Sequence, residues 1–233
     1  MSAPSNLAAR GLLNSTIGAK IVMALTGFVL VGFVVQHMVA NLQLYAGPDA
    51  LNSYAAGLKG LGGGSVVWLG RAFLLACLGL HVAAAIKLGN RNRAARPARY
   101  AVQRFRQTTY AARFMLLTGF VVLFFIAYHI AHFTVGVVQP ESFSVVDAAG
   151  RHDVWRMVVA GFRDPLTATL YVIANVAVAV HLSHSVTSMF ATLGLSVGRY
   201  KPMIERIGPA VALVVLLGNI SFPLTVLLGL VHL

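Results

Sequence analysis

The sequence predicts an all-α integral membrane protein, a bundle of five transmembrane helices. Hydrophobic residues make up 58% of the 233 residues and charged residues only 10%, whereas soluble domains carry about 25% charged residues. The mean hydropathy is +0.79. The long apolar stretches are continuous and do not alternate with polar residues, which excludes membrane-spanning strands. The single cysteine, Cys77, excludes a disulfide-stapled secreted domain.

Five apolar stretches are long enough to cross a bilayer, which takes roughly 20 mostly apolar residues. They cover about residues 18–42, 66–90, 110–137, 167–195 and 208–231, and together they form a single domain over residues 1–233. A glycine-rich break at residues 60–65 precedes the second stretch. Asp164 and Pro165 predict the N-cap and first turn of the fourth, and Gly208-Pro209 predicts the start of the fifth.

The basic residues predict the orientation of the bundle. The chain carries 18 Lys and Arg against 6 Asp and Glu, for a net charge of +12. A basic soluble protein would suggest nucleic-acid binding, but this chain has too little polar surface for that class. If the five helices alternate in direction, 13 of the 18 basic residues and a single acidic residue lie on the side of the N-terminus. The positive-inside rule then predicts a cytoplasmic N-terminus. The expected location is the bacterial cytoplasmic (inner) membrane.

Histidines are the second unusual feature of the composition. Ionisable side chains inside a membrane are costly and usually face the interior of a bundle, where they have a partner. The chain has 8 histidines. His152 and His232 lie outside the spans and are expected to be solvated. The others lie inside the spans, away from the ends: His37, His81, His129, His132, His181 and His184.

These histidines fall into two layers. At ~1.5 Å per residue, His37 and His129 lie ~25 and ~24 Å from the cytoplasmic ends of their helices, in the outer half of the membrane. By the same rise, His81 and His181 lie ~20 and ~24 Å from the outer ends, in the inner half. Two pairs from facing helices at two depths are what two bis-histidine haems require. A zinc or copper site would instead need ligands that converge at one depth.

Two of the spans offer a second histidine. His132 follows His129, and His184 follows His181, at a spacing of three that places both rings on one face of the helix. Spacing alone therefore leaves the ligand open. The depths favour His129 and His181, with His132 and His184 as alternates that would orient a ligand, donate to a propionate or line a quinone pocket. Small residues in these spans allow close approach of a macrocycle or of another helix: Gly27, Gly32, Gly79 and Gly119.

The sequence resembles the diheme cytochrome b membrane anchor of succinate dehydrogenases and fumarate reductases, in its single-subunit, five-helix form. The resemblance covers most of the chain. It rests on His81, on residues 18–27, 36–42, 45–48, 128–134 and 181–185, and on Leu193-Gly194. Some members of that family use a glutamate near the fourth-span histidine in a proton path. Residues 178–180 are Val-Ala-Val here, so that path is not carried over.

The resemblance implies two b haems, with His37 and His129 holding the outer one and His81 and His181 the inner one. It also implies a flavoprotein subunit with covalent FAD and an iron–sulfur subunit on the cytoplasmic face. Electrons from succinate would pass to a membrane quinone, or in reverse to fumarate. The chain has no nucleotide-binding fingerprint and no cysteine cluster, so it is not expected to oxidise succinate by itself.

A quinone needs hydrogen-bond donors for its carbonyls and an apolar slot for its tail. Asn14, Ser15 and Lys20 are candidates at the cytoplasmic interface, although residues of this kind also serve as helix N-caps. An outer site near Asn41 and Gln43 is a further possibility.

Two other functions remain open from the sequence. One is the haem b anchor of a different membrane dehydrogenase, which neighbouring subunits would distinguish. The other is a transporter whose histidines relay protons. A transporter would normally show inverted repeats or intramembrane carboxylates, and neither is evident in the sequence.

Overall fold

A computed structural model describes residues 15–95 and 109–233 and contains five helices long and apolar enough to cross a membrane. In these residues the only strand-like pairing is an isolated bridge between Val146 and His152. The predicted all-α membrane fold is thereby confirmed. The five spans are built from α2 (Thr16–Asn41), α4 (Ser65–Ala94), α6 (Met115–Ile130) with the π-helical turn η3 (Ala131–Val135), α9 (Pro165–Thr192) and α10 (Lys201–Leu227).

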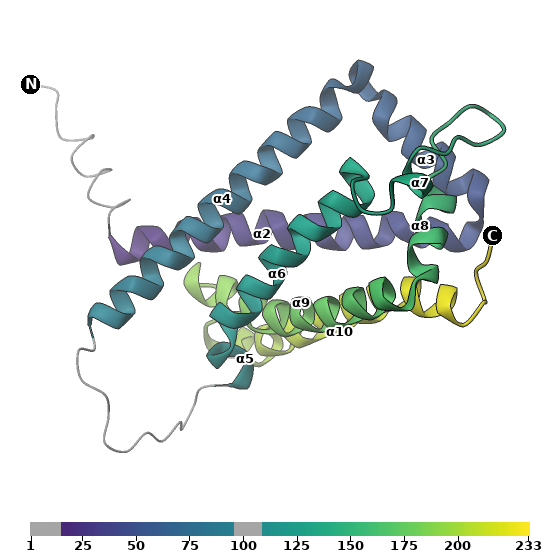
Figure 1. Ribbon diagram of the computed structural model, residues 1–233. Helices are drawn as coiled ribbons and strands as arrows, with labels where there is room; N and C mark the ends of the chain where they lie inside the picture. Colours follow the sequence, from purple (N-terminus) through teal and green to yellow (C-terminus); the bar gives the residue numbers. More distant parts are fainter. Residues whose placement is uncertain (1–14, 96–108) are drawn as a thin grey trace, which may run out of the picture.

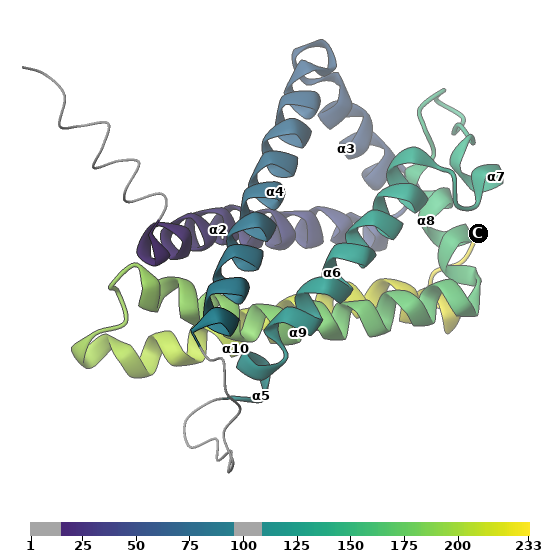
Figure 2. The ribbon, with the colours of Figure 1, turned by 60° about the vertical axis from the view of Figure 1, so that its left-hand side comes forward.

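Helix α9 is the central helix of the bundle. It packs against α10, α2 and α6, and α4 packs on α2. Figures 1 and 2 both show α9 and α10 side by side, with α4 and α6 running obliquely to them. Among the described residues, α4 packs far more closely on α2 than on α6 or α9. The histidine-bearing helices α4 and α9 therefore face each other without close helix packing between them.

The two ends of the bundle differ in structure. One end, here called the cap end, holds η1 (Leu42–Ala46), α3 (Pro48–Gly60), α7 (Pro140–Phe143) and α8 (Val154–Arg163). Three glycines with positive φ, Gly62, Gly63 and Gly64, make the turn η2 (Leu61–Gly64), from which α4 returns along the bundle. The other end, here called the basic end, holds the start of α2, the end of α4, α5 (Tyr110–Arg113) and η4 (Gly198–Tyr200).

The helix starts follow the capping signals with one exception. Asp164 accepts a hydrogen bond from the backbone N–H of Thr167 at 2.9 Å and caps α9, as predicted. The predicted start of the fifth span at Gly208-Pro209 is wrong, because α10 already begins at Lys201. Pro202 occupies the first turn, where a missing N–H costs nothing, and Pro209 lies inside the helix.

Gly208 marks a close contact between helices, not a helix start. A Cβ atom at this position would collide with the carbonyl oxygen of Ser183 and with the Thr187 hydroxyl, both on α9. The glycine therefore lets α10 approach the backbone of α9, which is the role that small residues play in membrane helix packing. The core between α2, α9 and α10 is built on Met38, Leu182 and Val215, among other apolar residues.

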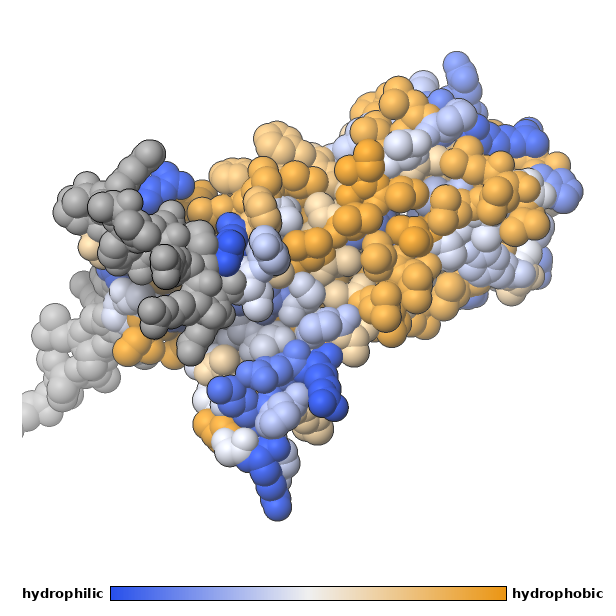
Figure 3. All heavy atoms as spheres, turned by 90° about the horizontal axis from the view of Figure 1, so that it is seen from below, coloured by the Kyte–Doolittle hydropathy of each residue, from blue (hydrophilic) through white to orange (hydrophobic). Residues whose placement is uncertain are grey.

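The outward face of the bundle is apolar, as a lipid-facing surface requires. Phe124 is 73% exposed, Leu69 70% and Trp68 68%. Figure 3 shows hydrophobic residues over the middle of one face, with the most hydrophilic residues away from it. Contiguous apolar surface of this kind is not stable in water, so it supports the assignment to a membrane.

The α9–α10 contact gives a first prediction. Gly208→Ala is expected to lower the stability of the bundle by about 1–3 kcal/mol, because the rigid backbone of α9 cannot yield to the added methyl group. Gly70→Ala on α4 is the control, since a Cβ at that position would meet no atom within 4 Å. Thermal unfolding in detergent checks the pair, and equal melting temperatures would contradict the prediction.

Candidate functional site

Thr26 of α2 fixes the orientation of the His81 ring on α4. The Thr26 hydroxyl lies 2.7 Å from the carbonyl oxygen of Val22 and 3.3 Å from His81 Nδ1. A hydroxyl has one hydrogen to donate, and the backbone carbonyl takes it. The hydroxyl oxygen therefore accepts from His81 Nδ1–H. A neutral imidazole protonated at Nδ1 keeps a free lone pair on Nε2, which is the form that binds a metal.

Thr118 of α6 does the same for His181 of α9. Its hydroxyl donates to the carbonyl oxygen of Phe114 at 2.9 Å and lies 3.2 Å from His181 Nδ1. Because the single hydroxyl hydrogen of Thr118 goes to that carbonyl, the hydroxyl oxygen accepts from His181 Nδ1–H. His181 thus carries its proton on Nδ1 and presents an unprotonated Nε2. His81 and His181 are also near enough to interact electrostatically. The structure thus brings together the two histidines that the sequence predicts for one layer.

Helices α2 and α6 carry the same short pattern. Thr26-Gly27 precedes His37 by 11 residues, counted from the threonine, and Thr118-Gly119 precedes His129 by the same 11. Eleven residues are about three helical turns, or ~16 Å of rise, so the threonine and the histidine lie on one face of each helix. Sequence reasoning noted the two glycines and missed the threonines. The repeated spacing is the signal that would have revealed them.

The glycines of this pattern leave room beside the histidine rings. A Cβ at Gly27 would lie 3.4 Å from His81 Cε1, and a Cβ at Gly119 would lie 3.5 Å from His181 Cε1. A larger side chain at either position would fill the space next to the ring. The donor set, two imidazoles with small residues against their rings, therefore suits ligation of a haem iron by His81 and His181.

The second layer pairs His37 of α2 with His129 of α6. Their ring centroids are 5.7 Å apart and the rings are nearly perpendicular, at 86°. His37 also stacks on Phe33 at 5.4 Å. The structure therefore brings together the two histidines that the sequence predicts for the other layer, and these two would be the residues that hold a haem there.

His129 and His132 have different surroundings. His132 is 2% exposed, and its Nδ1 lies 3.1 Å from Tyr171 Oη and its Nε2 3.2 Å from Gln139 Oε1. Both of its ring nitrogens are therefore engaged. His129 Nδ1 lies 3.3 Å from the same Tyr171 Oη, which leaves Nε2 for a ligand. The contacts favour His129 over His132 as the ligand. For the alternate His184, the described residues show no ring hydrogen bond.

The predicted quinone residues do not gather into a site in the described structure. Ser15 accepts a hydrogen bond from the backbone N–H of Gly18 at 2.9 Å and serves as the N-cap of α2, which was the alternative reading of this residue. Lys20 is exposed. Asn14 lies outside the described residues.

A polar cluster at the cap end was missed by the sequence reasoning. Asn52 of α3 is 1% exposed. Its amide nitrogen donates to Asp147 at 3.2 Å and Asp153 at 2.9 Å, and its oxygen accepts from the backbone N–H of Trp155 at 3.0 Å. Arg151 forms ion pairs with Asp147 and Asp49. The cluster ties α3 to the start of α8.

This cluster gives a second prediction. Asn52→Leu removes one donor from each of the two carboxylates and the side-chain acceptor of the Trp155 backbone N–H, and an unsatisfied buried group costs about 1–3 kcal/mol. The expected result is a clearly lower melting temperature. Ala56→Ser, at an exposed position of the same helix, is the control and is expected to change stability by less than about 0.5 kcal/mol. A melting temperature unchanged in Asn52→Leu would contradict this account of the cap end.

Comparisons of the chain with models of protein families, with curated proteins and with solved structures give no match. In the described residues, no three or more His, Cys, Asp and Glu side chains converge on a possible metal site. The functional argument therefore depends on the two histidine pairs and on the residues that orient them.

Proposed function

We propose that the chain is the membrane-anchor cytochrome b subunit of a succinate:quinone oxidoreductase or quinol:fumarate reductase. In this role it carries electrons between an iron–sulfur subunit and membrane quinone. The observation that carries the proposal is the hydrogen bonding of His81 and His181. Each presents an unprotonated Nε2 because a threonine on a neighbouring helix accepts its Nδ1–H. The resemblance of the sequence to the family supplies the choice of enzyme.

Four histidines would hold the two haems. His81 and His181 would ligate the haem nearer the basic end, and His37 and His129 the haem nearer the cap end. When bound, the two haems would supply one-electron carriers at two depths of the membrane. The residues of the chain fix the ligand tautomers, and Gly27 and Gly119 keep space beside the rings.

The charged residues at the cap end fit the carboxylates of a haem. Lys59 and Arg71 line a hollow of about 320 Å³ together with Thr134 of η3. The Arg71 guanidinium lies over the Trp68 ring at 4.9 Å, which holds it at this position. Two cations next to η3, close in sequence to His129, are suited to neutralising propionate groups.

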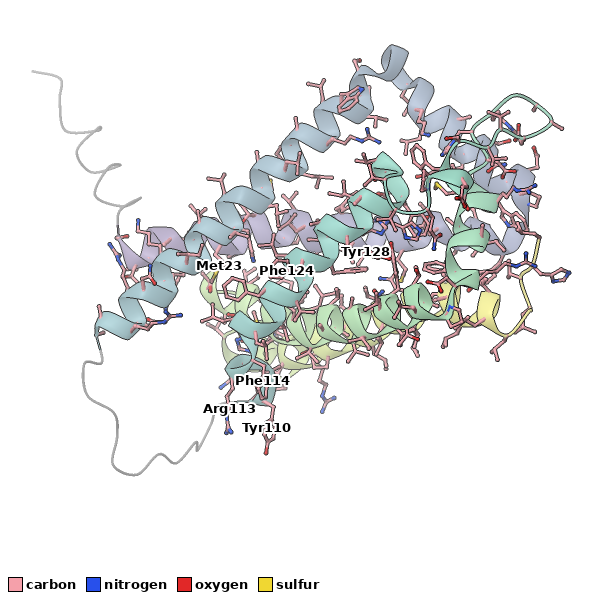
Figure 4. The ribbon with its side chains drawn as sticks, in the orientation of Figure 1. Met23, Tyr110, Arg113, Phe114, Phe124 and Tyr128 are labelled. Carbon is pink, nitrogen blue, oxygen red and sulfur yellow. The ribbon has the colours of Figure 1, made fainter. Side chains whose placement is uncertain are left out.

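The basic end fits the docking of soluble subunits. Among the residues that the structure describes, this end carries many basic side chains and one acidic one, Glu205. Glu205 Oε1 lies 3.9 Å from Lys201 Nζ. Figure 4 shows Tyr110 and Arg113 extending from α5 away from the bundle. This end would face the cytoplasm and receive the iron–sulfur subunit and, through it, the flavoprotein. Basic groups at this level also suit anionic lipid headgroups.

The proposal is tested by purifying the chain with its native partners from membranes. A covalent flavin in the complex, and reduction of b-type haem on addition of succinate, are the expected results. Haem that is reduced by a different donor, with no covalent flavin present, would assign the chain to another dehydrogenase. A purified complex without haem would reject the proposal.

A further inference from the structure

A chain of five hydrogen bonds connects His129 to Asp164 at the start of α9. The links join Tyr171 Oη to His129 Nδ1 at 3.3 Å and to His132 Nδ1 at 3.1 Å. The next join His132 Nε2 to Gln139 Oε1 at 3.2 Å and Gln139 Nε2 to Thr167 Oγ1 at 3.5 Å. The last joins the Thr167 hydroxyl to Asp164 Oδ2 at 2.6 Å. The proposed function uses His129 and leaves the rest of this chain unexplained.

The carboxylate at one end fixes the direction of the first links. The hydrogen bonds from the Thr167 hydroxyl and backbone N–H hold the pKa of Asp164 below its usual range, so Asp164 is an acceptor at neutral pH. The Thr167 hydroxyl must then donate to Asp164, and its oxygen accepts from the amide nitrogen of Gln139. This orientation turns the Gln139 carbonyl oxygen toward His132.

The remaining links follow from the same count of hydrogens. His132 donates from Nε2 to the Gln139 oxygen, so a neutral His132 accepts at Nδ1. The Tyr171 hydroxyl donates to that Nδ1, and its oxygen accepts from His129 Nδ1–H. Every group in the chain then donates toward Asp164, and each of the five hydrogen bonds has one donor and one acceptor. His129 is left with an unprotonated Nε2, the form required of a ligand.

The backbone at Gln139 supports a specific role for this link. Gln139 is the only described non-glycine residue with positive φ, at 54°, a conformation that costs roughly 1–2 kcal/mol for an L-residue. Its amide bridges His132 of η3 and Thr167 of α9. The strained backbone therefore places the Gln139 side chain between the two groups that it hydrogen-bonds. Backbone strain of this kind is typical of sites that position functional groups.

We propose that this chain, anchored on Asp164, sets the tautomer of His129 and tunes the reduction potential of the cap-end haem alone. Tyr171, Gln139 and Asp164 are positioning residues, since they act through His129. The inference rests on the proposed function, because it needs haem at His129. His81 and His181 instead donate to threonine hydroxyls that end on neutral backbone carbonyls. A carboxylate-terminated chain makes His129 the more electron-donating ligand and favours the oxidised haem.

Three variants interrupt the chain at different points, and redox titration of the purified complex by visible spectroscopy measures both haems. Tyr171→Phe removes the acceptor for His129, Gln139→Gly removes the central link while relieving the backbone, and Asp164→Asn keeps an acceptor oxygen without its charge. Each is expected to shift the cap-end haem toward the reduced form, by about tenfold in the equilibrium or 59 mV for one electron. The other haem is expected to keep its potential.

Tyr45→Phe is the matched control. It deletes a tyrosine hydroxyl that bonds Ser221 at the cap end and lies outside the chain, so both potentials are expected to stay unchanged. Unaltered potentials in Gln139→Gly and Asp164→Asn, or equal shifts of both haems, would overturn the inference while leaving the two haems in place. A wild-type protein without haem would instead overturn the proposed function and this inference with it. Glycine adopts the positive φ of position 139 without strain, so Gln139→Gly is expected to fold. This variant therefore tests the inference even if Tyr171→Phe misfolds.

Discussion

His129→Ala is expected to remove one of two haems from the purified protein, whereas His132→Ala is expected to retain both. Within the described residues, His129 has only its Nδ1 engaged, by Tyr171, and so has a nitrogen available for iron. His132 has both nitrogens occupied by Tyr171 and Gln139. The number of haems per polypeptide, measured in both variants, tests this difference directly. Loss of haem in His132→Ala with retention in His129→Ala would show that the ligand on this span is the alternate residue.

The same comparison applies to the fourth span. His181→Ala is expected to remove the other haem, because the hydrogen bond from His181 Nδ1–H to Thr118 holds His181 in the ligating tautomer. His184→Ala is the control and is expected to keep two haems. The two single losses should also differ spectroscopically, since each leaves a different haem behind. If His129→Ala and His181→Ala each removed both haems, the two-layer arrangement would be contradicted.

Thr118→Val is expected to weaken haem binding at the basic-end pair without abolishing it. Valine has nearly the shape of threonine but offers no acceptor, so the His181 ring loses its side-chain hydrogen-bond partner on α6. Loss of an outer partner of a metal-bound histidine typically costs 10–100-fold in metal affinity or activity. The measurement is the haem content after dilution or competition with apomyoglobin. Thr26→Val is expected to act in the same way through His81.

The control for these variants is Thr225→Val on α10. Thr225 makes the same kind of hydrogen bond to a carbonyl one turn earlier, at 2.8 Å from Ser221, but it contacts no histidine of the site. Its variant is expected to keep full haem content. An equal loss of haem in Thr225→Val would mean that the effect comes from the helix backbone and not from the histidine.

Hydropathy and helix signals were sufficient to predict the five spans, because the apolar stretches are long and Asp164-Pro165 is a strong N-cap pattern. They failed at the start of α10, where Gly208-Pro209 has the composition of a helix start. Glycine serves there for contact with α9, which no local pattern reveals. The short helix α3 and its buried Asn52 were also missed, since the partners of Asn52 come from residues about 100 positions away.

On two of the spans, the sequence could narrow the haem ligand only to one of two neighbouring histidines. His129 and His132 share a helix face, so their spacing cannot separate them. The distinction comes from Tyr171 on α9 and Gln139 before α7, which meet His132 only in the folded bundle. Thr26 and Thr118 were within reach of sequence analysis, since both precede a histidine by the same 11 residues. The predicted cytoplasmic N-terminus and the partner subunits stay predictions.

The most direct test of the central claim is haem quantification combined with a reduced-minus-oxidised spectrum of the purified complex. Two b-type haems per chain, resolved as two redox transitions, are the result that the histidine pairs predict. A single haem per chain, or the absence of b-type bands, would contradict the two-layer arrangement of His37 with His129 and His81 with His181.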